Sequence, residues 1–199
     1  MQVTILKNEN SLYEIKKSKF FSYAFFVPDM QFIKDTLASL KKENVGARHI
    51  CYAYVVGSQE KCSDDGEPSG TAGKPLLDLI KNNGYNNMLL VVVRYFGGIK
   101  LGAGGLYRAY ITAGKQAIEK CEKVELEKAT QFDVVIPYPY ETKIMNIIKG
   151  YNVENLKVQY LDNIVVTFII RDKNFDLLEK DLMSNNIEFL TKIVQVKRG

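Results

Sequence analysis

Two glycine-rich segments constrain this chain most, because each one follows a strand-like pattern and leads into a helix-like pattern. They cover residues 63–75 and 94–106 and hold eight of the fourteen glycines. Glycine is concentrated where a backbone turns sharply or approaches another group closely. A loop at the start of a helix also presents unpaired N–H groups at the positive end of the helix dipole. We therefore expect the chemistry of the molecule at these two loops.

The residue pattern in the N-terminal part of the chain predicts alternating strands and helices. Strands are identified by aromatic and β-branched runs, and helices by apolar residues that recur every three or four positions. The run 88–93 is apolar at every position, which is typical of a strand covered on both faces. The expected strands are 13–15, 19–27, 47–57 and 88–95, and the expected helices are a segment capped by Asp29 that stops at 44–46, then 71–83 and 102–123.

The charged, alternating segment 122–128 is the expected boundary between two domains, 1–127 and 128–199. The pattern of apolar residues in the second domain predicts the order strand, helix, strand, strand, helix, strand. A tight turn is expected at Asp162 and Asn163. This βαββαβ order is the ferredoxin-like pattern. The expected elements are strands at 130–136, 153–161, 164–170 and 187–196, and helices around 144–151 and 175–182. The fold class is therefore α+β.

Composition excludes several kinds of protein. The longest apolar run, 88–93, is far shorter than the roughly 20 residues that a membrane span needs. Three scattered cysteines and a single histidine, His49, argue against a disulfide framework, a zinc site and a Ser-His-Asp triad. We expect a soluble, cytoplasmic protein without a metal or cofactor. The net charge is +4, and residues 1–129 carry the excess, with 18 basic and 14 acidic side chains.

The second glycine segment is a candidate anion site. Arg94, Lys100 and Arg108 surround its glycines, and guanidinium groups add charge-assisted hydrogen bonds to a phosphate held at a helix start. The spacing fits neither a Walker A loop nor a dinucleotide fingerprint. A tight turn with close helix–strand packing is the alternative explanation. The candidate residues are Arg94, Gly97, Gly98, Lys100, Gly102, Gly104, Gly105 and Arg108.

The first segment brings Asp64, Asp65 and Glu67 within four residues. Such carboxylates can hold Mg²⁺ or serve as acid and base. They can equally form a solvated turn that stabilises the next helix, or pair with the basic side chains of the second loop. The residues of this acidic loop are Ser63, Asp64, Asp65, Gly66, Glu67, Ser69, Gly70, Thr71, Gly73 and Lys74.

Aromatic side chains are interleaved with the basic ones, a mixture that suits stacking on unpaired bases. The candidates are Tyr52, Tyr54, Tyr95 and Phe96. Tyr52 and Tyr54 share one face of their strand, which is either an exposed platform or half-buried core.

Both segments resemble the signature blocks of the YigZ/IMPACT family, and 49–54 and 104–110 also fit that family. The layout resembles a bacterial member with a C-terminal domain. The resemblance implies an N-terminal domain like domain 2 of ribosomal protein S5 and a C-terminal domain similar to the last domain of elongation factor G. It also implies a regulator of translation, since eukaryotic members restrain a starvation-sensing kinase through its activator.

The favoured hypothesis is therefore a non-enzymatic binding protein linked to translation regulation, whose partners are RNA, the ribosome, or a protein of the translation or stress-response machinery. The alternative is a phosphate- or nucleotide-dependent enzyme that uses both loops. A pure protein-interaction adaptor is a third class. No catalytic residue is assigned.

Overall fold

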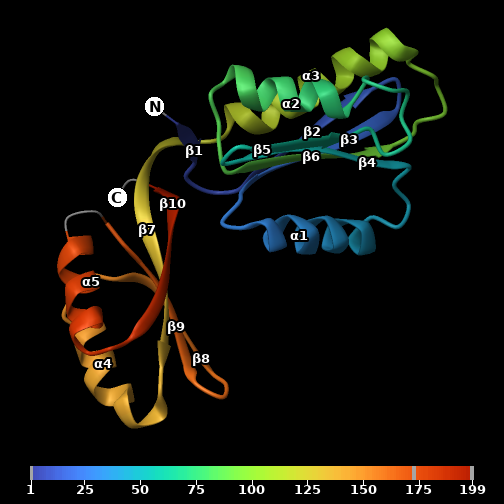
Figure 1. The fold of residues 1–199 in the computed structure, drawn as a ribbon. Helices are drawn as coiled ribbons and strands as arrows, with labels where there is room; N and C mark the ends of the chain where they lie inside the picture. The colour runs from blue at the N-terminus through green and yellow to red at the C-terminus, as the bar shows by residue number, and fades with distance from the viewer. Residues whose placement is uncertain (1, 172–173, 198–199) are drawn as a thin grey trace. The chain divides into compact units, whose positions relative to one another are not determined.

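The computed structural model describes residues 2–171 and 174–197, and these form two compact units (Figure 1). The first unit runs to Leu126 and includes Lys197, and the second covers Glu127–Val196. The mixed composition of strands and helices confirms the expected α+β class.

The first unit is built on an antiparallel sheet in the order β2-β3-β6-β4-β5. Figure 1 shows α2 and α3 over one face of this sheet and α1 over the other. The strands are β2 (Glu9–Ile15), β3 (Ser18–Phe26), β4 (His49–Val56), β5 (Gln59–Ser63) and β6 (Met88–Tyr95), and the helices are α1 (Met30–Glu43), α2 (Gly73–Asn82) and α3 (Ala103–Glu119).

Strand alternation divides the apolar side chains of this unit between two cores. On β4, Cys51 and Ala53 pack with α2 and α3, whereas Ile50 and Tyr54 belong to the core under α1. Successive side chains of a strand point to opposite faces, so one strand serves both layers. β6 is buried from Met88 to Arg94, which confirms that it is covered on both faces.

The sequence prediction missed two strands at the margins. The chain does not pass from β4 directly into the acidic loop, because Gly57, with a φ of 59°, turns it into β5. β5 is polar and lies at the edge of its sheet, so it carries no apolar pattern. The three-residue strand β1 (Val3–Ile5) was also not expected. Helix α1 is capped by the Asp29 carboxylate as predicted, whereas α3 ends at Glu119, earlier than expected.

The second unit has the predicted βαββαβ order. Its sheet runs β10-β7-β9-β8, and the first residues of β7 also pair with β1. This strand order is that of the ferredoxin-like fold. One face of the sheet packs on both helices through Phe132, Phe168 and Leu178. The elements are β7 (Lys123–Ile136), α4 (Glu141–Lys149), β8 (Glu154–Tyr160), β9 (Ile164–Ile170), α5 (Phe175–Ser184) and β10 (Glu188–Lys197).

Most of the expected boundary segment, 122–128, belongs to a strand. The division between Leu126 and Glu127 falls inside β7, whose first residues pair with Val3–Ile5. Alternating charges in 122–128 therefore reflect a strand rather than a linker. The likeness of the two units to ribosomal protein S5 and to elongation factor G stays a prediction.

Candidate functional site

Asp64 fixes the acidic loop to the start of α2. Its Oδ1 accepts hydrogen bonds from the N–H groups of Ala72 and Gly73 at 2.9 and 2.8 Å, and its Oδ2 accepts one from Gly70 at 2.9 Å. Burial raises the pKa of this carboxyl group, but the three backbone hydrogen bonds outweigh burial and hold the pKa below its ordinary value. Asp64 is thus a helix cap supplied from eight residues upstream.

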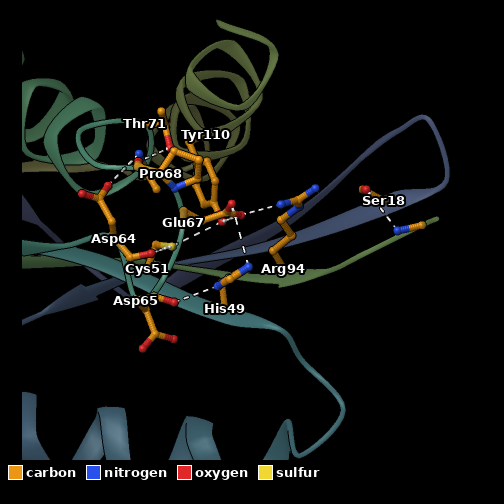
Figure 2. A network of polar contacts seen from close by, with 12 residues as sticks. Ser18, His49, Cys51, Asp64, Asp65, Glu67, Pro68, Thr71, Arg94 and Tyr110 are labelled. Atoms are coloured by element: carbon orange, nitrogen blue, oxygen red, sulfur yellow. Dashed lines mark hydrogen bonds and ion pairs between the residues drawn. The ribbon is translucent and has the colours of Figure 1, made fainter. Parts of the chain in front are cut away.

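Asp65 ties the same loop to β4. Its Oδ2 accepts a hydrogen bond from the Ile50 N–H at 2.6 Å, and its carbonyl oxygen lies 2.7 Å from His49 Nδ1. A carbonyl oxygen can only accept, so Nδ1 of His49 carries a proton. Figure 2 shows the Asp65 carboxylate pointing away from Glu67. The three acidic side chains do not converge, so the paired-carboxylate and Mg²⁺ alternatives lack the geometry they need.

Glu67 instead points into the molecule and meets Arg94 of β6 (Figure 2). Its Oε1 accepts hydrogen bonds from Arg94 Nη1 at 2.5 Å and from the Tyr110 hydroxyl at 2.9 Å. The side chains of Glu67 and Arg94 are only 3% and 5% exposed. A buried charge is tolerated when it is paired and hydrogen-bonded. The prediction that the acidic loop pairs with the second loop is confirmed for this arginine.

The remaining polar groups beside Glu67 do not form an activated nucleophile. Burial raises the pKa of the Cys51 thiol to about 12, although the Tyr110 hydrogen bond lowers it, and nearby carboxylates raise it further. Burial also raises the pKa of Tyr110. Since the thiolate is the reactive form of cysteine, Cys51 is a structural residue at neutral pH. His49 Nε2 lies 3.8 Å from Glu67 Oε2, too far for a hydrogen bond.

The second glycine loop approaches the β2–β3 turn closely. A Cβ at Gly97 would lie 2.0 Å from the carbonyl carbon of Lys17, and the Gly97 N–H donates to Ser18 Oγ at 3.1 Å. Further along, Gly102 precedes α3 with a φ of 71°, in the left-handed region that favours glycine. Among the described residues no side chain caps α3, and its first turn contains no acidic residue. This helix start is therefore open to an anion.

A cleft of about 380 Å³ lies between the two signature loops. Glu67, Arg94 and Leu106 are its buried members, and Leu101 adds half-buried apolar surface beside the start of α3. The guanidinium carbons of Arg48 and Arg94 lie 5.5 and 5.6 Å from the centre of the Phe96 ring, within the range of cation–π attraction. The cleft is lined by Arg48, His49, Gly66, Glu67, Pro68, Arg94, Phe96, Lys100, Leu101, Gly102, Ala103 and Leu106.

The structure corrects part of the stacking prediction. Tyr54 is buried and Tyr52 is half-buried in the core that α1 covers, so the face they share is not an exposed platform. Tyr95 is half-buried as well, and its hydroxyl donates to Asn44 Oδ1 at 2.8 Å. Among the four candidates, Phe96 is the one with an exposed ring, at 39%.

Arg94 also has a different place from the one expected. It is buried against Glu67 and the Phe20 ring, so it belongs to the framework of the site rather than to its surface. Lys100 and Arg108 are exposed, and Arg108 Nη1 reaches back toward Gly104. These two residues are the exposed cations among those predicted for the second loop.

The other predicted residues of the acidic loop have local roles. Thr71 Oγ1 donates to the Pro68 carbonyl at 2.6 Å, and Ser63 Oγ accepts from the Asp65 N–H at 3.3 Å. Lys74 points to the surface and pairs with Asp78 at 2.6 Å. Gly73 packs against the Ser63 backbone, while Ser69 is exposed.

Sequence reasoning left three basic residues out of the site. Lys16 and Lys17 are exposed at the β2–β3 turn, both with positive φ, and the Lys17 backbone contacts Gly97. Arg48 precedes β4, and its N–H donates to the Arg94 carbonyl. The antiparallel pairing of β3 and β4 with β6 brings all three to the strand end where the second loop begins. Such pairing has no signature in the local sequence.

Comparison with known proteins identifies the family of this chain, and the matched segment contains both signature loops. The Impact N-terminal domain model matches residues 16–118, which is more than half of the chain. The chain belongs to the IMPACT family. This IMPACT-family protein is 36% identical over 174 residues to an IMPACT family member of Haemophilus influenzae, which covers 85% of this chain and 84% of that protein.

Two further comparisons extend the likeness beyond the signature loops. The IMPACT family member YigZ of Escherichia coli is 38% identical over 136 residues, 66% of this chain and 67% of its own length. The crystal structure of a hypothetical protein, 28% identical, superposes with a TM-score of 0.73 over 95% of this chain and 96% of its own. The likeness of this IMPACT-family protein to its relatives therefore includes the second unit.

Two features are absent from the described part of the chain: a cluster of metal ligands and a membrane-spanning helix. Within 2–171 and 174–197, no three His, Cys, Asp or Glu side chains gather as metal ligands. In the same residues no helix is both long and apolar enough to cross a bilayer.

Proposed function

We propose that this protein is a non-enzymatic binding protein of the translation machinery that contacts RNA through its basic strand-end face. We define this face as Lys16, Lys17, Arg48, Phe96, Lys100 and Arg108, which gather around the second glycine loop and the start of α3. The family resemblance supports the link to translation and, with it, a cytoplasmic location, where the partners would be RNA, the ribosome or a protein bound to them.

The open start of α3 beside these exposed cations is the observation that carries the proposal. Backbone N–H groups, the helix dipole and Lys100 all favour an anion at this place. Phe96 adds a partly exposed ring, and base stacking on aromatic side chains is a common feature of single-stranded RNA binding. The carboxylates that an Mg²⁺-dependent enzyme would need are instead hydrogen-bonded to β4, to the start of α2 and to Arg94. This distribution supports binding over catalysis.

Co-sedimentation with ribosomes over a salt series tests the proposal. Removal of one phosphate-binding side chain should reduce the dependence of log K on log salt by about one unit. The test variant is Lys100→Ala with Arg108→Ala, both exposed, and we expect weaker binding with a smaller salt slope. Arg94 is left intact, because its loss would disturb folding.

The matched control removes the same charge elsewhere, through Lys42→Ala and Lys61→Ala on α1 and β5. This control variant should bind as the unchanged protein does. Equal weakening of both variants would mean that net charge alone drives association. No association at any salt concentration would overturn the proposal.

A further inference from the structure

The cleft between the signature loops has the size of a site for one small group, rather than a track for a continuous strand. Its volume of about 380 Å³ is near the lower end of the range for small-molecule pockets. It also combines two kinds of surface. The α3 start, Lys100 and Arg48 are polar and cationic, whereas Phe96 and Leu106 are apolar.

The polar side suits a phosphate with several free oxygens. The first N–H groups of a helix have no intrahelical partner, and within residues 2–171 and 174–197 no side chain caps those of α3. Gly102 and Ala103, at the beginning of this helix, are exposed and line the cleft. A terminal phosphate monoester has three unesterified oxygens, whereas an internal diester has two. The monoester therefore offers one more acceptor to the N–H groups of a helix start and to Lys100.

A second observation is independent of the helix start. Arg94 lines the same cleft with its side chain 5% exposed, and its Nε has no hydrogen-bond partner among the described residues. Glu67 engages Nη1 of this guanidinium. A buried donor without a partner is costly, so the wall of this cleft holds hydrogen-bonding capacity that Glu67 does not use. The one carboxylate in the lining, Glu67, is already paired and does not offset the other cations.

Resting on the proposed RNA contact, we propose that this cleft holds the phosphorylated end of an RNA chain, with the terminal phosphate at the α3 start and the terminal base against Phe96. Lys100 and Arg48 supply the charge, and the exposed part of the Phe96 ring, beside the Arg48 guanidinium, supplies the stacking surface. The lysines of the β2–β3 turn, Lys16 and Lys17, lie outside the cleft lining and meet the following phosphates.

Competition binding with three short RNAs of one sequence tests this inference. One carries a 5′-phosphate, one a 3′-phosphate and one hydroxyl groups at both ends. We expect one phosphorylated RNA to bind about tenfold more tightly than the unphosphorylated one, as charge-assisted hydrogen bonds to a phosphate would give. Whichever end is preferred identifies the strand polarity in the cleft.

Two variants locate the preference. Lys100→Ala should remove most of the difference between phosphorylated and unphosphorylated RNA. Lys16→Ala with Lys17→Ala should weaken all three RNAs by a similar factor and keep the preference. Unchanged thermal melting shows that each variant is folded.

The outcomes separate the two proposals. Equal affinity for all three RNAs would overturn the terminal-phosphate site and leave the RNA-binding proposal standing. A preference that survives Lys100→Ala would overturn its placement at α3. Failure of every RNA to bind at low salt would overturn both proposals.

Discussion

The two signature loops have the same order of strand, glycine loop and helix, but their helix starts are in opposite states. At α2, Asp64 satisfies the N–H groups of Ala72 and Gly73. At α3, Gly102 offers no cap and no acidic residue follows in the first turn. The first loop is closed by its own side chain, whereas the second is left open.

This difference indicates that the first loop belongs to the framework of the molecule, whereas the second loop forms the binding surface. The acidic loop directs its carboxylates to backbone N–H groups and to the buried Arg94. The second loop keeps Lys100 and Arg108 exposed. A glycine-rich loop before a helix is therefore not enough to identify an anion site. The helix start can bind an external anion only if no carboxylate of the chain, such as that of Asp64 at α2, already occupies it.

The largest effect should come from the pair that joins the loops. Arg94→Ala leaves the buried Glu67 carboxylate without its cation, and we expect the free energy of unfolding to fall by about 3–5 kcal/mol. Denaturant titration measures the change. A matched double variant, Arg94→Met with Glu67→Gln, removes both charges and should be less destabilised than Arg94→Ala. If Arg94→Ala lowered the free energy of unfolding by less than about 1 kcal/mol, this pair would contribute no more than a surface ion pair does.

A smaller loss should follow when the first loop is made like the second. Asp64→Ala removes the acceptor for three backbone N–H groups, and we expect a loss of about 2 kcal/mol, since a single N-cap contributes about 1. Asp29→Ala is the control, because Asp29 caps α1 through one hydrogen bond to the Phe32 N–H. If the two variants lose equal stability, the additional bonds of Asp64 contribute nothing.

The same residue should make the stability of the first loop depend on pH. The folded-state pKa of Asp64 is below its unfolded value, which is about 3.9. Its stabilisation is therefore complete above that unfolded value and is lost as the pH falls through the lower, folded-state pKa. We expect the difference in unfolding free energy between the unchanged protein and Asp64→Ala to be constant near neutral pH and to shrink below about pH 4. A constant difference down to pH 2 would contradict the shift.

The smallest effect on stability should come from the second loop. Lys100→Ala with Arg108→Ala changes exposed side chains, and we expect the unfolding free energy to stay within about 0.5 kcal/mol. Thermal melting checks this expectation. A large destabilisation would show that this loop, too, is held together by its charges.

The sequence predicted the elements that have a strong apolar pattern. β6 and its burial on both faces followed from 88–93, and the ferredoxin-like order followed from the alternation of patterns after residue 130. β5 was missed because an exposed edge strand needs no apolar periodicity. The S5-like and elongation factor G-like assignments rest on resemblance alone.

The sequence identified which residues lie at the site, but not which of their side chains are buried and which are exposed. The sequence singled out both Arg94 and Glu67, and pairing between the two segments was one of three alternatives for the carboxylates. That both are buried depends on Tyr110 and on β6, 43 and 27 residues away from Glu67. Burial of Tyr54 under α1 likewise depends on which sheet face α1 covers. Local patterns carry no information on these long-range choices.

The buried Glu67 has a consequence for the order of events in folding. Its carboxylate cannot leave water at an acceptable free energy until Arg94 is in place. We therefore expect the acidic loop to dock late, after β6, which carries Arg94, has joined the sheet. Interactions that are absent from the transition state act mainly on the unfolding rate. Loss of this ion pair should thus shorten the lifetime of the native state while leaving the rate of refolding almost unchanged.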